Sequence, residues 1–222
     1  MTAPRIALIS ATPLAIAPAA SAIAEAFPDG DIWNLLDDRL LADAQQQGGI
    51  SEPLAARMDR LIELALAGGA DGVLLTCSQY GVRADARDAS ADGVSVLSAD
   101  GALFDEVVSH RPSRVLLVAS LESAAADSTE RLGAVAASAG LEVEIVPLVV
   151  PEAARPSVGR ELAELLAVAI REVADVYDVV MLAQYSLAPA ADALDREFPV
   201  PVLDGPRAAA RRLRTQLGGA AA

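Results

Sequence analysis

The chain has 222 residues, of which 53% are hydrophobic, and a formal net charge of −14 at pH 7. This length allows a sizeable core in one large or two small domains, and the negative charge argues against nucleic-acid or anionic-membrane partners. The chain has no lysine, one histidine and one cysteine (Cys77), which excludes a pyridoxal phosphate Schiff base, a GxxxxGK[ST] phosphate loop, a Cys/His zinc site and an internal disulfide. We therefore expect no cofactor and no metal, although counting residues does not exclude a carboxylate-bound ion.

The first apolar segment, "IALISATPLAIAPAA" at 6–20, has the apolar character of a secretory signal. Pro13 and Pro18 interrupt it, and a matching segment lies in the interior of the chain. We therefore interpret its start as a β-strand. No segment has the roughly 20 uninterrupted apolar residues of a membrane helix, so we expect a cytoplasmic protein with no membrane partner.

Short runs rich in Val, Ile and Leu alternate along the chain with segments of helical periodicity. The helix expected at 51–70 has Ser51 as N-cap, Pro53 in its first turn and Gly68-Gly69 at its end. The second half has a counterpart at 159–178, which also directly precedes a strand. Two further helices are expected at 100–108 and 206–217.

The strand segments occur twice, at a nearly constant offset. The matched segments are 4–12 with 113–121 (offset 109), 30–36 with 140–146 (110), 71–77 with 178–184 (107) and 94–102 with 200–208 (106). The two halves of the chain therefore look duplicated.

Continuous apolar strands that alternate with helices are typical of parallel sheets covered on both faces. We predict an α/β protein of two pseudo-symmetric, doubly wound parallel-sheet halves around a central cleft. Each half is expected to take its last helix from the other. The predicted domains are thus 1–98 plus 205–222 and 99–204.

Ligands of doubly wound sheets bind at the carboxyl ends of the strands, so the polar residues there are the candidate site. If the halves face each other, Cys77 and Gln184 confront one another over a bound ligand. The candidate catalytic residue is Cys77, and the candidate substrate-binding residues are Ser10, Thr12, Asn34, Ser78, Gln79, Ser120, Gln184, Tyr185 and Ser186.

Two segments, "GADGVLLTCSQYG" (69–81) and "DVVMLAQYSLAPA" (178–190), resemble the two catalytic-cysteine segments of the aspartate/glutamate/hydantoin racemase superfamily. The opening "IALISATP" (6–13), the strand end "VLSADGALFDEVV" (96–108) and the closing "VPVLDGPRAAARRL" (200–213) support the resemblance, which covers nearly the whole chain. It implies two α/β halves around a cleft. It also implies cofactor-free proton transfer at the carbon next to a carboxylate, with one cysteine on each face.

The sequence departs from this pattern at the second catalytic position, which is Gln184. A glutamine amide binds an oxygen but does not exchange protons at useful rates, so two-cysteine racemisation is excluded. Cys77 remains a candidate acid/base, because the amino end of the segment that begins "SQY" favours its thiolate. A nucleophilic role and a buried, inert thiol are the alternatives.

We therefore expect a superfamily enzyme of racemase or isomerase type that acts on a small carboxylate-bearing molecule. The alternatives are a one-cysteine decarboxylase or lyase of malonate-like substrates, and a carboxylate-binding protein without turnover. Thr12, Ser78 and Ser120 are expected to bind a carboxylate or to cap helices. Asp37 and Asp38 are expected to pair with Arg39 at the surface, and the alternative is that they lean into the cleft as a base. The sequence allows a homo-oligomer without requiring one.

Overall fold

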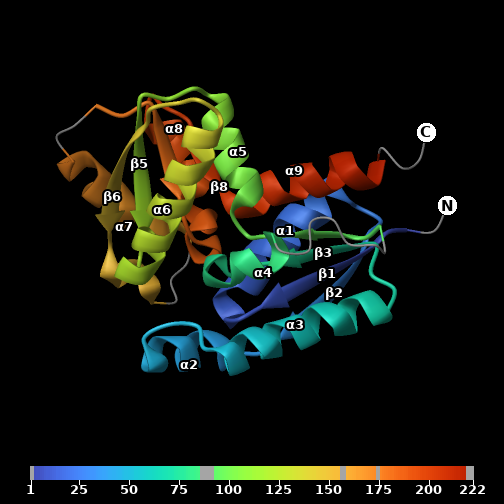
Figure 1. Ribbon diagram of the computed structural model, residues 1–222. Coiled ribbons are helices and arrows are strands. Elements are labelled where there is room, and N and C mark those ends of the chain that lie inside the picture. The colour runs from blue at the N-terminus through green and yellow to red at the C-terminus, as the bar shows by residue number, and fades with distance from the viewer. Residues whose placement is uncertain (1–2, 86–92, 156–158, 174–175, 219–222) are drawn as a thin grey trace. The chain divides into compact units, whose positions relative to one another are not determined.

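The structure is a computed structural model that describes residues 3–85, 93–155, 159–173 and 176–218. Its internal contacts group into two compact units (Figure 1). Unit 1 is Met1–Ala102 with Pro206–Ala222, and unit 2 is Leu103–Gly205. Each unit therefore contains one complete sheet.

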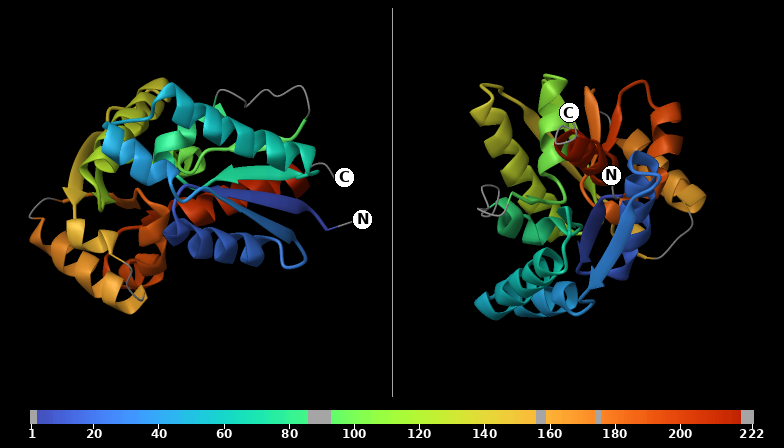
Figure 2. Two further views of the ribbon diagram at one scale, coloured as in Figure 1. Left: turned by 90° about the horizontal axis from the view of Figure 1, so that it is seen from below. Right: turned by 90° about the vertical axis from the view of Figure 1, so that its right-hand side faces the viewer.

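Unit 1 contains a four-stranded sheet in the order β2-β1-β3-β4, in which every neighbouring pair is parallel. Helices α2 and α3 cover one face of this sheet, and α1 and α9 cover the other (Figure 2). The strands are β1 (Arg5–Ser10), β2 (Asp31–Leu36), β3 (Gly72–Leu75) and β4 (Ser95–Leu97), and the helices are α1 (Ile16–Ala26), α2 (Leu40–Gln47), α3 (Glu52–Ala67), α4 (Gly81–Asp85) and α9 (Gly205–Gly218).

Unit 2 repeats this topology, with a parallel sheet in the order β6-β5-β7-β8. The strands are β5 (Arg114–Ala119), β6 (Glu144–Val149), β7 (Val179–Leu182) and β8 (Val202–Asp204), and the helices are α5 (Gly101–Ser109), α6 (Glu122–Ser138), α7 (Gly159–Glu172) and α8 (Ala191–Glu197). The predicted fold class, two α/β halves with parallel sheets, is confirmed.

The helix expected at 51–70 begins and ends close to its predicted signals. Helix α3 starts directly after Ser51, has Pro53 in its first turn and stops before Gly68. Ser51 has the extended backbone of an N-cap, but its hydroxyl donates to Gln47 Oε1 at 2.8 Å and makes no capping bond. The helix expected at 159–178 is shorter, because α7 ends at Glu172; positions 174–175 of that range lie outside the described residues.

The register of the two sheets corrects one of the four predicted repeats. Arg5 of β1 pairs with Asp31 in the first sheet, and Arg114 of β5 pairs with Glu144 in the second. Strand β2 therefore corresponds to β6 at an offset of 113, and the predicted 110 is wrong. Each arginine also forms an ion pair with its cross-strand acid, at 2.7 Å and 2.8 Å, so the correspondence extends to the side chains.

Within the described part of the chain, no helix is both long and apolar enough to span a bilayer.

Candidate active site

The strand order places the candidate site at the same point of each sheet. The order reverses direction between β1 and β3 in unit 1 and between β5 and β7 in unit 2. Doubly wound sheets bind ligands at the carboxyl ends of the strands beside such a reversal. Cys77 lies two residues after β3, and Gln184 lies two residues after β7. The two residues are therefore equivalent by topology, as the sequence repeat predicts.

Cys77 is the N-cap of a short 3-10 helix, η2 (Ser78–Tyr80), that leads directly into α4. Its backbone is extended, and its side chain packs in the core cluster between the sheet and helices α2 and α3. The residue is 8% exposed. A thiol at this place is near the first N–H groups of a helical segment, whose partial positive charge favours an anion.

Ser10 lies on the other face of this sheet. Its hydroxyl shares a hydrogen bond of 2.9 Å with the hydroxyl of Thr76, and both residues are buried. Cys77 and Leu75 belong to the core cluster on the α2 and α3 side, and side chains alternate between faces along a strand. The structure therefore brings Ser10 to Thr76, a partner that the sequence analysis missed, and away from Cys77.

Gln184 is held by the strand beside it. Its Oε1 atom accepts a hydrogen bond from the backbone N–H of Ser120 at 2.6 Å and another from the Ser120 hydroxyl at 3.0 Å. A backbone N–H is only a donor, which identifies the accepting amide atom as oxygen. The –NH2 group of Gln184 is thus the end that remains to donate to a ligand. In unit 1, Ala11 has the strand position of Ser120 and offers no hydroxyl.

The other candidate residues follow the carboxyl ends of β1, β3 and β7, with one exception. Thr12 caps the 3-10 helix η1 (Pro13–Ala15) by accepting from Leu14 N at 3.4 Å. Ser78 and Gln79 are half-buried in η2, and in the corresponding helix η4 (Tyr185–Ala190) Tyr185 is buried and Ser186 is half-buried. The strand-end position expected for Asn34 is wrong, because β2 continues for two residues beyond it.

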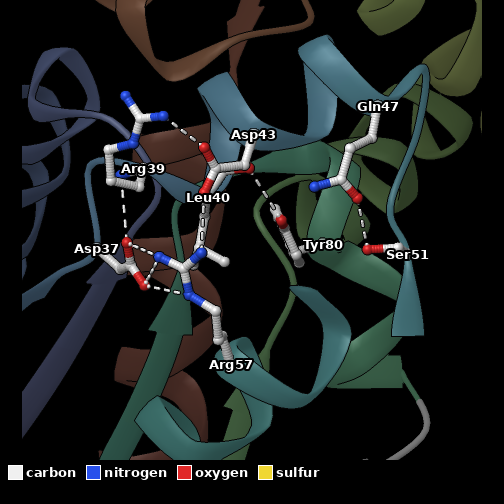
Figure 3. A network of polar contacts seen from close by, with 8 residues as sticks. All are labelled: Asp37, Arg39, Leu40, Asp43, Gln47, Ser51, Arg57 and Tyr80. Atoms are coloured by element: carbon white, nitrogen blue, oxygen red, sulfur yellow. Dashed lines mark hydrogen bonds and ion pairs between the residues drawn. The ribbon is translucent and has the colours of Figure 1, made fainter. Parts of the chain in front are cut away.

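A polar network at the start of α2 involves an arginine, Arg57, that no sequence motif indicates (Figure 3). Arg57 of α3 binds both carboxylate oxygens of Asp37, at 2.6 to 2.9 Å, and donates to Asp43 of α2 at 2.9 Å. The expected pairing of Asp37 with the Arg39 side chain is wrong, because that guanidinium bonds to Asp43 at 2.7 Å. Long-range packing of α3 against the loop after β2 produces this exchange of partners.

The charges of this network stabilise one another. The hydrogen bond from Arg57 is the main cause that lowers the pKa of the Asp43 carboxyl, with a further contribution from Arg39. Hydrogen bonds to Asp37 and Asp43 raise the pKa of Arg57. Asp43 and Arg57 therefore stay ionised at neutral pH. Both carboxylate oxygens of Asp37 bind Arg57, so Asp37 is a structural partner of this arginine.

No group of three His, Cys, Asp or Glu side chains is arranged to bind a metal ion in the ranges that the structure describes.

No family model matches the sequence, and no curated protein matches it significantly. Solved structures do match over nearly the whole chain. Allantoin racemase from Klebsiella pneumoniae aligns with a TM-score of 0.68 and 17% identity, covering 98% of this chain and 89% of that one. A glutamate racemase from Bacillus anthracis aligns with a TM-score of 0.72 and 13% identity, covering 99% and 84%. An arylmalonate decarboxylase aligns with a TM-score of 0.61 and 19% identity, covering 97% and 93%.

The chain has the fold of the aspartate/glutamate/hydantoin racemase superfamily, as its two repeated segments predict. The identities are too low for the likeness to extend beyond the fold.

Proposed function

We propose that this protein is an enzyme with the racemase fold that performs cofactor-independent acid/base chemistry at the carbon next to a carboxylate of a small molecule, by a one-base isomerisation rather than a racemisation, because Cys77 is its single thiol. In the proposed step, the Cys77 thiolate removes the proton from that carbon and leaves an enediolate. The thiol then returns a proton from the same face, either to the same carbon, which gives exchange with retention, or to another carbon of the delocalised anion, which gives an isomer. The observation that carries the proposal is the position of Cys77, the only thiol of the chain, at the end of β3 and at the N-cap of η2.

Gln184 has a different role in this proposal. Its oxygen is occupied by Ser120, so its –NH2 group is proposed to donate to an oxygen of the substrate. Neither amide group titrates near neutral pH, and Gln184 therefore supplies no second acid/base. Proton exchange at the reacting carbon is accordingly expected on one face only.

A decarboxylase is the second candidate, because a reaction with one protonation step requires only one acid. Loss of CO2 from a malonate-like substrate leaves the bonding electrons in an enediolate, which takes the proton of the Cys77 thiol; solvent then restores that proton. Gln184 in place of a second thiol favours this candidate, and so does the shared fold with an arylmalonate decarboxylase.

The test uses Cys77 as its own reporter, because every thiol modification of this chain occurs there. Alkylation by iodoacetamide is followed by mass spectrometry at a series of pH values, with and without amino acids, hydantoins and substituted malonates. We expect a folded-state rate near pH 7 above that of the urea-unfolded chain, and protection by at least one carboxylate. The same compounds are incubated with the enzyme in D2O and followed by NMR for deuterium uptake or loss of CO2.

An alkylation rate no higher than that of the unfolded chain, with no protection, would contradict the proposal. Protection without deuterium uptake or decarboxylation would instead favour the carboxylate-binding protein without turnover.

A further inference from the structure

Tyr80 connects the Cys77 segment to helix α2. It lies three residues after Cys77, and its backbone N–H donates to the Cys77 carbonyl at 3.2 Å. Its hydroxyl donates to the carbonyl oxygen of Leu40, the first residue of α2, at 3.1 Å. Tyr80 is fully buried, and burial raises its pKa to about 12, with a smaller contribution from negative charge on Cys77. The phenol is therefore a protonated donor at neutral pH.

Arg57 fixes the chain on both sides of Leu40. Its bidentate bond to Asp37 holds the turn before α2, and its bond to Asp43 holds the first turn of the helix (Figure 3). Leu40 itself is buried in the same core cluster as Cys77 and Tyr80. Helix α2 is thus attached to α3 through Arg57 and to the Cys77 segment through Tyr80.

A bidentate arginine–carboxylate pair restricts orientation as well as distance. Arg57 and its two acidic partners are all partly buried, so loss of the guanidinium would leave two carboxylates close together without their main counter-ion. We expect the segment 37–47 to move away from Cys77 in that case, and water to reach the thiol.

We propose that Tyr80 and Arg57 are positioning residues for Cys77, with α2 as the element through which Arg57 acts. The hydroxyl of Tyr80 holds η2 against α2, Arg57 holds α2 against α3, and together they define the place of the thiol at the N-cap of η2. This inference rests on the proposed function, in which Cys77 is the reacting group.

The experiment measures the pH–rate profile of Cys77 alkylation in folded full-length variants. Tyr80→Phe keeps the ring and removes only the hydroxyl, and Arg57→Met keeps much of the side-chain volume and removes the charge. We expect both profiles to move by about 0.5 pH unit or more toward the midpoint of an unperturbed thiol, about 8.5. Arg57→Lys keeps the charge without the bidentate geometry and should give an intermediate profile.

Matched controls separate positioning from a general loss of stability. Tyr177→Phe removes a half-buried tyrosine hydroxyl from unit 2, and Arg5→Met removes an aspartate-paired arginine from the amino edge of the same sheet as Cys77. Both controls should reproduce the wild-type profile. For any substrate that the wild type turns over, kcat should fall in Tyr80→Phe and Arg57→Met with little change in KM.

Wild-type alkylation profiles in folded Tyr80→Phe and Arg57→Lys would overturn the inference. Profiles that move as expected, in a protein that no carboxylate protects, would retain the positioning role and contradict the proposed function, so the two failures are distinguishable. If Arg57→Met does not fold, the pair Tyr80→Phe and Arg57→Lys decides the question.

Discussion

The amide oxygen of Gln184 accepts two hydrogen bonds from Ser120, one from the backbone N–H and one from the hydroxyl. This relationship joins the ends of β5 and β7 and determines which end of the amide can meet a ligand. The corresponding strand ends in unit 1 carry Ala11 and Cys77, a methyl group and a thiol. Equivalent positions of the two units thus carry different functional groups.

Substitution of Gln184→Cys supplies a second acid/base at the position equivalent to Cys77. The two Ser120 donors that now bind the amide oxygen would favour a thiolate there. We expect weak racemisation, measured by chiral chromatography of products formed in D2O, for substrates whose proton the wild type exchanges with retention. The control Gln45→Cys places a thiol on an exposed part of α2 and should leave the products optically pure.

Racemisation by the wild type would contradict one-sided proton transfer and require a second base. A folded Gln184→Cys variant that still gives optically pure products would show that this position does not address the reacting carbon.

The variant Cys77→Ser tests the thiol itself. A serine hydroxyl is far less acidic than a thiol, so turnover should fall to background while the circular dichroism spectrum is retained. The change of one sulfur atom to oxygen at the edge of the core should alter the free energy of unfolding by only about 1 kcal/mol. Full activity would remove Cys77 from the mechanism, and loss of the folded spectrum would indicate a packing role.

Stability at high pH should depend on Tyr80. Its pKa is about 12 in the folded protein, against 10.0 for an unperturbed tyrosine, so the unfolded chain ionises first as the pH rises. The contribution of Tyr80 is fully present below pH 10 and is lost between pH 10 and about 12, a total of roughly 2 to 3 kcal/mol. Urea unfolding at pH 9, 10 and 11 should show a shallower decline for Tyr80→Phe than for the wild type.

Urea unfolding of Tyr177→Phe is measured at the same pH values, because burial also raises the pKa of Tyr177. If the free energy of unfolding of Tyr80→Phe declines with pH as steeply as that of the wild type, Tyr80 is not the group responsible for the decline. This holds whatever the substitution does to the absolute free energy of unfolding.

The substitution Ser128→Ala in α6 should stabilise the protein. Ser128 is fully buried, and its hydroxyl has no hydrogen-bond partner among the residues that the structure describes. Removing an unsatisfied buried hydroxyl and gaining helix propensity should raise the free energy of unfolding by about 1 kcal/mol. Ser138→Ala in the same helix is the control, since its exposed hydroxyl donates to the Ala134 carbonyl at 2.9 Å. Thermal unfolding with no gain for Ser128→Ala relative to Ser138→Ala would refute this prediction.

The sequence alone was sufficient to predict the duplicated α/β pattern and the strand-end positions of Cys77 and Gln184. These features follow from short-range periodicity, because a buried parallel strand is a continuous apolar run that ends where polar residues begin. The limits of α3 at Ser51 and Gly68 are equally local.

Which side chains meet depends on the tertiary structure. Ser10 bonds to Thr76 and Gln184 to Ser120 because strand register aligns residues more than sixty positions apart. Arg57 displaces Arg39 as the partner of Asp37 because α3 packs beside the loop after β2. Such pairings depend on the packing of whole elements, whose geometry no local pattern of residues contains, and for that reason the sequence could place the thiol of Cys77 but not its neighbours.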